Sequence, residues 1–309
     1  MKTLAIIGAR LNSSRLPGKH LMPLAGKPLI ARVYERLLLA HRIDEIVLAT
    51  TADSYNQQLV EWAISAGVGV KAYAGDVNDL MGRLDAVITE FDPQYIVYIC
   101  GDCPLIEPVF IDHALNALMV SPEHDSIVLK AEVQSLHEGM AFYTRSGWNK
   151  LYEVSQCDMS REHVGYADKL SPILQKLAIE DSGDYSKIKH RISVDTPADY
   201  HFMSEIYTRW YQHHSADSIV DLGWVQQQLV ADPELAAINM HVQQKKPDIK
   251  YQNVTLFCLA GHEAGIGHLR RCSRIANALQ EYLGLGTEIK LLSLQANAPH
   301  IETKSSVFT

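Results

Sequence analysis

The 309-residue sequence lacks any apolar run of the roughly 18 to 20 residues that a membrane-spanning helix needs. A short apolar run at residues 4–7 is superficially signal-like, but Arg10 ends it too early for a signal peptide. Basic residues are not in excess either, because the formal charge is −8 and the isoelectric point about 5.9. We therefore expect a cytoplasmic protein with no membrane span and no nucleic-acid partner.

Cysteine is scarce, and its five copies are an odd number spread along the chain, which excludes a disulfide scaffold. Cys100 and Cys103 form a C-x-x-C pair, so redox chemistry and metal binding have to be considered. A metal site would need a second Cys/His pair at suitable spacing, and none is evident. Redox chemistry is also disfavoured, because Asp102, which lies between the two cysteines, has another explanation, given below.

The sequence does contain apolar runs that alternate with helical patterns. Strands are predicted at residues 4–7, 45–50, 68–73 and 95–100, and helices at 29–40, 57–65 and 79–90. Strands that are apolar throughout and separated by helices indicate a parallel sheet covered on both faces. Less regular strands are predicted at 126–143 and 191–194, and mostly helix from about 199 to 239. The predicted fold class is α/β with a mostly parallel sheet.

A polar, helix-breaking stretch at residues 243–248 predicts a linker. We therefore divide the chain into a first domain at 1–242, a linker at 243–250 and a second unit at 251–309. The second unit begins with an apolar strand at 254–260, and a helix is predicted at 273–282. This pattern indicates a partial second Rossmann-like unit.

The loop at residues 8–19 directly follows the first predicted strand and carries cations, hydroxyls and glycines. Backbone N–H groups and hydroxyls can hold phosphate oxygens while the cations offset their charge, so the loop suits a triphosphate. It is neither a Walker A loop nor G-x-G-x-x-G. The alternative is a solvated basic loop. The candidate catalytic residues, which would bind the phosphates, are Arg10, Arg15 and Lys19. The candidate nucleotide-binding residues of the loop are Gly8, Ala9, Ser13 and Ser14.

Two aspartates end apolar runs and are candidate metal ligands. Asp102 follows the run at 95–100, and Asp195 follows the run at 191–194. Magnesium prefers one or two carboxylates together with phosphate oxygens and water. Each aspartate alone could instead belong to a turn or a helix cap. We interpret Asp199 as part of a helix start, with Thr196 as the capping residue.

Three motifs together resemble one family. R-x-x-S-x-R-x-P-G-K at 10–19, G-D-x-P-L at 101–105 and V-D-T-P-x-D at 194–199 are similar to those of CMP-Kdo synthetases and SpsF-type cytidylyltransferases of surface and spore-coat polysaccharide pathways. The resemblance covers about residues 1–240, although Gly8 and Asn12 depart from the family pattern. It implies a Rossmann-like nucleotidyltransferase fold, a homodimer, and Mg²⁺ bound by Asp102 and Asp195.

The same resemblance gives candidates on the base and sugar sides. Arg83 lies in a stretch similar to the D-V-L-x-R of SpsF-like chains, and it either reaches the base or ribose or pairs with Asp79 on its own helix. Residues 137–143 resemble a CMP-Kdo synthetase segment, whereas 161–164 resemble an SpsF segment. The candidate substrate-binding residues are His137, Arg161, Glu162 and His163. His163 has a structural role as its alternative.

In the second unit, G-x-G-H-x-x-R at 265–271 resembles the start of SpsG-like and PseG-like proteins of GT-B type. That fold needs two Rossmann-like halves, and the sequence supplies only the beginning of the first. We therefore interpret residues 251–309 as an incomplete fusion partner, in which His268 is not expected to act.

These features favour a Mg²⁺-dependent enzyme that transfers CMP from CTP to a sugar acid. One alternative is a nucleotidyltransferase that acts on a sugar 1-phosphate with another NTP. Another is a non-catalytic nucleotide-sugar-binding module fused to a glycosyltransferase.

Overall fold

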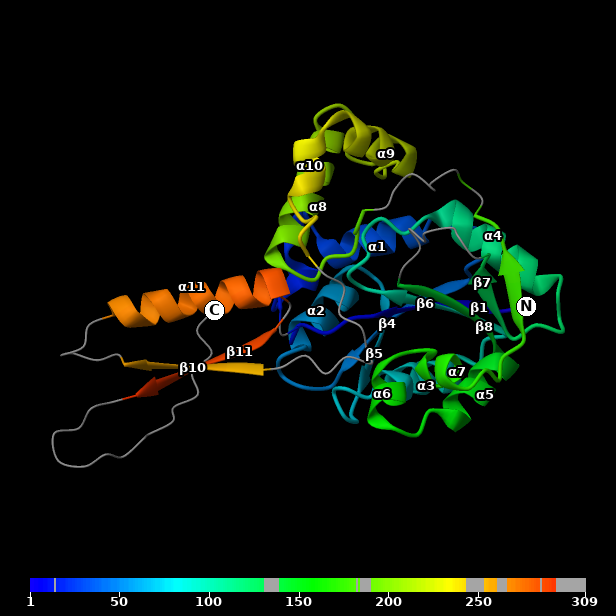
Figure 1. The fold of residues 1–309 in the computed structure, drawn as a ribbon. Coiled ribbons are helices and arrows are strands. Elements are labelled where there is room, and N and C mark those ends of the chain that lie inside the picture. Colours follow the sequence, from blue (N-terminus) through cyan, green and yellow to red (C-terminus); the bar gives the residue numbers. More distant parts are fainter. Residues whose placement is uncertain are drawn as a thin grey trace.

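A computed structural model describes residues 1–13, 15–130, 139–181, 183, 190–242, 253–259, 266–283 and 285–292. Within the first 180 residues, seven strands build one sheet with the order β5-β4-β1-β6-β8-β7-β9 (Figure 1). Its strands are β1 (Thr3–Gly8), β4 (Glu45–Thr51), β5 (Gly69–Tyr73), β6 (Tyr95–Cys100), β7 (Ser126–Leu129), β8 (Met140–Thr144) and β9 (Lys176–Ile179).

The sheet is parallel except around β8, which pairs antiparallel with both β6 and β7. The parallel pairs are β1 with β4 and β6, β4 with β5, and β7 with β9. The predicted α/β class with a mostly parallel sheet is therefore confirmed. The irregular stretch predicted at 126–143 contains all of β7 and most of β8, whereas β9 was not predicted.

Successive residues of the buried strands face opposite layers of helices. On β1, Ala5 and Ile7 pack with α1 (Leu29–Leu37), α2 (Gln57–Ser65), α4 (Pro108–Met119) and α8 (Pro197–Tyr211). Leu4 and Ile6 pack on the other side with α3 (Leu80–Phe91) and α5 (Arg145–Val154). This alternation explains why the strands are apolar throughout, since each side chain enters one of two cores.

The remaining elements of the first unit are short or lie beside the sheet. A hairpin of β2 (Pro23–Leu24) and β3 (Lys27–Pro28) follows the 3-10 helix η1 (Lys19–Leu21). Two short helices, α6 (Asp158–Glu162) and α7 (Tyr166–Leu170), lie near α3, and α9 (Leu222–Ala231) and α10 (Pro233–Ala237) follow α8 (Figure 1). These three later helices agree with the helical prediction for 199–239.

The strand predicted at 191–194 is wrong. These residues form irregular backbone with a bend at Ser193 and join no sheet in the described structure. Their apolar pattern has a different cause, because Ile192 and Val194 are buried in the core beside α8. Val194 keeps one backbone hydrogen bond, from its N–H to the carbonyl of Asp102 at 2.9 Å. Burial of alternate side chains is therefore satisfied here without strand pairing.

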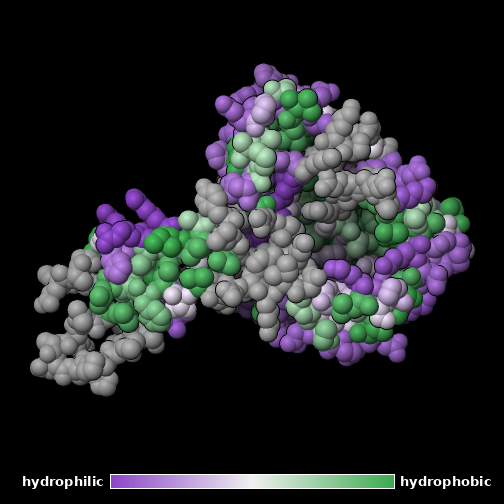
Figure 2. All heavy atoms as spheres, viewed as in Figure 1, coloured by the Kyte–Doolittle hydropathy of each residue, from purple (hydrophilic) through white to green (hydrophobic). Residues whose placement is uncertain are grey.

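The C-terminal unit is a β-α-β arrangement. Strands β10 (Asn253–Leu259) and β11 (Gly286–Leu292) pair in parallel, and α11 (Gly267–Leu283) connects them. The strand and helix predicted here are confirmed, although α11 begins earlier, and β11 extends the unit beyond the single β-α pair that we expected. Apolar side chains lie at its surface (Figure 2), including Phe257, Ile266 and Ile275. Among the described residues, no helix is long and apolar enough to span a membrane.

Candidate active site

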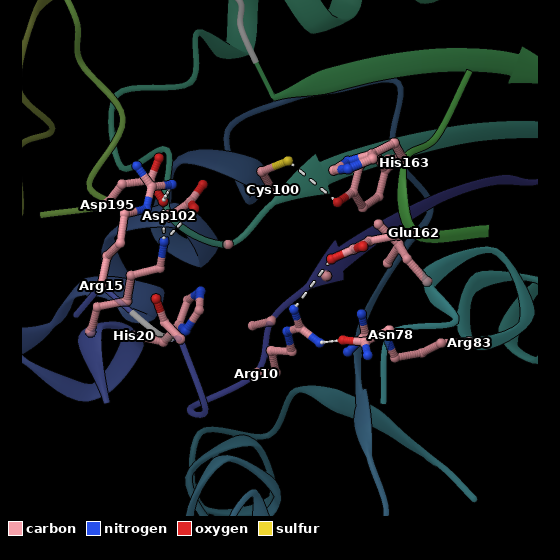
Figure 3. Close-up of a pocket in the computed structure, with 17 residues that line it drawn as sticks. Arg10, Arg15, His20, Asn78, Arg83, Cys100, Asp102, Glu162, His163 and Asp195 are labelled. Carbon is pink, nitrogen blue, oxygen red and sulfur yellow. Dashed lines mark hydrogen bonds and ion pairs between the residues drawn. The ribbon is translucent and has the colours of Figure 1, made fainter. Parts of the chain in front are cut away.

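A cavity of about 320 Å³ opens at the carboxyl ends of β1 and β6 (Figure 3). Parallel sheets present their ligand sites at this edge, because the loops that follow neighbouring strands meet there. The sequence candidates that line the cavity are Gly8, Ala9, Arg10, Ser13, Arg15, Lys19, Arg83, Asp102, Glu162, His163 and Asp195. Six lining residues were not candidates: His20, Asn78, Leu80, Tyr98, Cys100 and Gly101. Ser14 and His137 lie outside the described residues.

The conformation of the basic loop requires glycine at two positions. At Gly8 a Cβ would lie 2.9 Å from Cε2 of the buried Tyr98, so a side chain there would displace the cavity wall. Gly18 has a φ of 73°, in the left-handed region that glycine adopts without steric cost. Its left-handed conformation directs the chain into η1 and places Lys19 inside the site.

Lys19 joins the two candidate metal ligands. Its Nζ lies 2.6 Å from Oδ2 of Asp102 and 2.9 Å from Oδ1 of Asp195, and it also donates to the carbonyl of Val194 at 2.8 Å. Burial lowers the pKa of Lys19, but the two carboxylates raise it more, so the net pKa is above its ordinary value. Lys19 therefore stays charged, and the two aspartates converge on one cation.

Asp195 is surrounded by cations. Oδ1 also lies 3.1 Å from Nη2 of Arg15, while Oδ2 accepts a hydrogen bond from Nη2 of Arg191. Burial raises the pKa of Asp195, but Lys19, Arg15 and Arg191 together hold it well below its usual value. Asp195 is therefore an anion at neutral pH, as a hard-cation ligand must be.

Arg10, another cation of the site, makes its short contacts with neutral groups. Arg10 donates to the carbonyl of Val77 at 2.9 Å and to Oδ1 of Asn78 at 2.8 Å, and it lies 3.8 Å from Glu162. These contacts leave it at the cavity wall with about a third of its side chain exposed. Its position at the cavity wall suits the binding of an anionic ligand.

Arg83 is a buried guanidinium at the cavity wall, with only 4% of the residue exposed. Its Nε and Nη1 atoms have no hydrogen-bond partner among the described residues, and burial lowers its pKa. Asp79 instead caps α3 through the N–H of Gly82 and pairs with Arg161. The ion pair between Arg83 and Asp79, one of the two predicted alternatives, is thus not formed. A ligand that accepts hydrogen bonds would satisfy Arg83.

Arg161 does not line the cavity, unlike its neighbours Glu162 and His163. Its Nη2 donates to Oδ2 of Asp79 at 2.5 Å, and its guanidinium lies 4.7 Å from the ring of Tyr152. The structure therefore places Arg161 in a contact between α6 and α3, rather than among the groups that face the cavity.

His20 is a lining residue that sequence reasoning missed, although it directly follows Lys19 in the loop. Burial and the charge of Lys19 lower its pKa to about 3, so it is neutral at physiological pH. Nothing in the sequence pattern indicates burial in this loop, and two of the groups that act on His20, Asp102 and Asp195, come from distant segments.

The two cysteines of the C-x-x-C pair are free thiols. Burial raises the pKa of Cys100 to about 12 and also raises that of Cys103. Thiol redox chemistry needs an accessible thiolate, which these environments oppose. The redox interpretation therefore finds no support in the structure.

Fold and cavity together define the class of protein. A basic loop follows the first strand at the carboxyl edge of a mostly parallel sheet and faces two aspartates, an arrangement suited to binding a nucleotide. Residues 4–232 match the cytidylyltransferase family, and the chain belongs to it. The protein is thus a cytidylyltransferase enzyme.

Relatives support this assignment to different extents. The 3-deoxy-manno-octulosonate cytidylyltransferase of Geobacter sulfurreducens is 37% identical over 190 residues, which cover 53% of this chain and 74% of that relative. The Geobacter metallireducens enzyme of the same description is 36% identical, over 53% of its length. An uncharacterised protein of Methanocaldococcus jannaschii is 28% identical over 79% of this chain and 97% of its own.

Solved structures agree on the fold. A cytidylyltransferase from Leptospira borgpetersenii is 25% identical, with a TM-score of 0.66 over 76% of this chain and 97% of its own. A CMP:2-keto-3-deoxy-manno-octonic acid synthetase complexed with CTP has a TM-score of 0.52 at 19% identity, over 68% of this chain and 99% of its own. At that identity the likeness establishes the fold alone.

Proposed function

We propose that this cytidylyltransferase transfers CMP from CTP to a 2-keto sugar acid, giving a CMP-sugar and pyrophosphate for a surface polysaccharide or glycan. One observation carries the proposal: the basic loop, the buried Arg83 and the pair Asp102 and Asp195 all face one cavity. Similarity to 3-deoxy-manno-octulosonate cytidylyltransferases supports the sugar-acid acceptor.

The residues present fit a Mg²⁺ ion. Asp102 and Asp195 lie within hydrogen-bond distance of the same ammonium, so their oxygens can approach one cation. The described residues contain no cluster of three or more His, Cys, Asp or Glu side chains suited to a metal. Two carboxylates suffice for Mg²⁺, which completes its shell with phosphate oxygens and water. Bound there, it would supply charge neutralisation at the reacting phosphate.

Different groups of the protein position the triphosphate, the base or ribose, and the sugar. Arg10, Arg15 and Lys19 bind the triphosphate, with the N–H groups and hydroxyls of the loop between Gly8 and Ser14. Arg83 binds the base or ribose. Glu162 and His163 face the sugar, and His137 is kept on that side from the resemblance alone, whereas Arg161 supports α6 against α3. The anomeric hydroxyl attacks the α-phosphorus in line and pyrophosphate leaves, so catalysis consists of positioning and electrostatic stabilisation.

A pyrophosphate-release assay tests the proposal. The protein is incubated with Mg²⁺, one of four nucleoside triphosphates, and either a panel of 2-keto sugar acids or a panel of sugar 1-phosphates. We expect release only with CTP and a sugar acid, and none from Asp102→Asn. Release with a sugar 1-phosphate and another triphosphate would favour the alternative enzyme. No release with any pair would favour a binding module.

A further inference from the structure

The segment that carries Asp195 is irregular backbone held largely by side chains. The N–H groups of Asp195 and Thr196 donate to Oδ2 of Asp199 at 3.1 and 3.0 Å. The carbonyl of Arg191 accepts a hydrogen bond from Asn239 at 3.2 Å. Because this segment has no strand partner in the described structure, these side chains, together with the contacts of Val194, fix where Asp195 lies.

The two carboxylate oxygens of Asp195 have different partners. Oδ2 is bound by Arg191, whereas Oδ1 lies near Lys19 and Arg15 at 2.9 and 3.1 Å. Arg191 thus fixes the rotation of the carboxylate and leaves Oδ1 toward the cavity. A carboxylate that rotates freely would present its charge less well to a cation at one fixed place.

Arg191 is itself held by Asp199. Its Nε lies 3.3 Å from both carboxylate oxygens of Asp199, which is fully buried. The predicted helix start is confirmed, because Thr196 and Asp199 form a capping box at the start of α8. The carboxylate of Asp199 therefore both caps α8 and holds Arg191, and the sequence indicated only the cap.

Asn239, in the turn after α10, completes this network. It is 1% exposed, and its Nδ2 donates to Oδ1 of Asp199 at 2.9 Å as well as to the carbonyl of Arg191. Its Oδ1 contacts Nε2 of His190. A buried amide with both donors and its acceptor engaged enforces one geometry, since any other arrangement leaves buried polar groups unpaired.

We propose that Asn239 is a positioning residue of the nucleotide site: it holds Asp199 and the backbone of Arg191, so that Arg191 directs Oδ1 of Asp195 toward the bound cation. The inference rests on the proposed role of Asp195 as a Mg²⁺ ligand. It links the turn after α10 to the catalytic cavity. Mutation of a residue that holds a metal ligand in place commonly lowers metal affinity by about 10- to 100-fold.

The test measures CTP affinity twice for each protein, once with EDTA and once with Mn²⁺, in the absence of an acceptor sugar. The ratio of the two affinities is the coupling between metal and nucleotide. In Asn239→Ala we expect unchanged CTP affinity in EDTA and a Mn²⁺-dependent gain that is lower by about tenfold. A purely structural role would weaken both measurements together. Ser218→Ala is the matched control, because it removes the 2.9 Å hydrogen bond from Nε1 of Trp210 beside the end of α8.

Asn239→Ser serves if the alanine variant does not fold, because its hydroxyl keeps one donor in place of two without adding a charge beside Asp199, and the same result is expected. A folded variant with the full Mn²⁺-dependent gain, an equal loss in EDTA, or failure of both variants to fold would each overturn the inference. A wild-type protein without any gain would remove the metal role in the proposed function and this inference with it. A wild-type gain that survives in the variants would overturn this inference alone.

Discussion

Lys19 and Asp102 are separated by 83 residues in sequence and joined by an ion pair of 2.6 Å between Nζ and Oδ2. The lysine is almost fully buried, and it bonds the main chain at Val194 as well. From the sequence we assigned Lys19 to phosphate binding alone. The structure changes that expectation, because removal of this ammonium would leave two aspartates without their shared partner.

Lys19→Ala is therefore predicted to lower the free energy of unfolding by about 3 to 5 kcal/mol, since breaking a buried pair leaves uncompensated charge. Denaturant titration measures the change. Lys27→Ala is the control, because Lys27 pairs with Glu35 at an exposed position and should cost less than about 1 kcal/mol. Equal stability of the two variants would contradict the structural role of Lys19.

Arg15→Ala is predicted to weaken CTP binding with little change in melting temperature. Arg15 contacts the shared oxygen of Asp195, which keeps Lys19 and Arg191 as partners when Arg15 is lost. A charge-assisted contact to phosphate is worth about 1.5 to 3 kcal/mol, so CTP affinity should fall by roughly 10- to 150-fold. Unchanged affinity in a calorimetric titration would remove Arg15 from the triphosphate site.

Asp102→Asn is predicted to abolish most turnover while the protein stays folded. The amide keeps the shape of the side chain but is a poor ligand for Mg²⁺. Asp195→Asn should lose turnover too, with an added loss of stability because three cations face this carboxylate. Steady-state rates at limiting Mg²⁺ and thermal melts measure both effects. Near-normal turnover of Asp102→Asn would exclude that residue from the mechanism.

His20 gives a pH dependence of known sign. Its pKa is lowered from 6.5 to about 3 in the folded protein, so between these values the unfolded chain binds a proton that the folded protein does not. Stability is therefore lost as the pH falls through this window. The advantage of the wild type over His20→Gln in free energy of unfolding should shrink between about pH 7 and about pH 4. Denaturant unfolding at both pH values tests this, and a constant difference would show that His20 titrates normally.

A chain ending at Lys245 is predicted to stay folded and to retain pyrophosphate release. It keeps Asn239 and the whole cavity lining, whereas β10, α11 and β11 form their own small sheet and helix. Sedimentation and the release assay check this prediction. Loss of activity in a folded, truncated protein would show that residues beyond 245 belong to the site.

The sequence predicted the loop and both aspartates because these residues lie in short motifs next to apolar runs. It predicted the helix start at Thr196 and Asp199 for the same reason, since capping is local. It could not predict that Asp199 binds Arg191, or that Asn239 reaches Asp199 from 40 residues away. Tertiary packing selects such partners, and it also sets the irregular, unpaired backbone of residues 191–194.

The most direct test of the account is identification of the products by phosphorus NMR after incubation with CTP, Mg²⁺ and a 2-keto sugar acid. The account predicts a CMP-sugar phosphodiester and pyrophosphate in equal amounts, formed by the wild type and not by Asp102→Asn. Hydrolysis of CTP without a phosphodiester, or no consumption of CTP with any sugar acid, would contradict it.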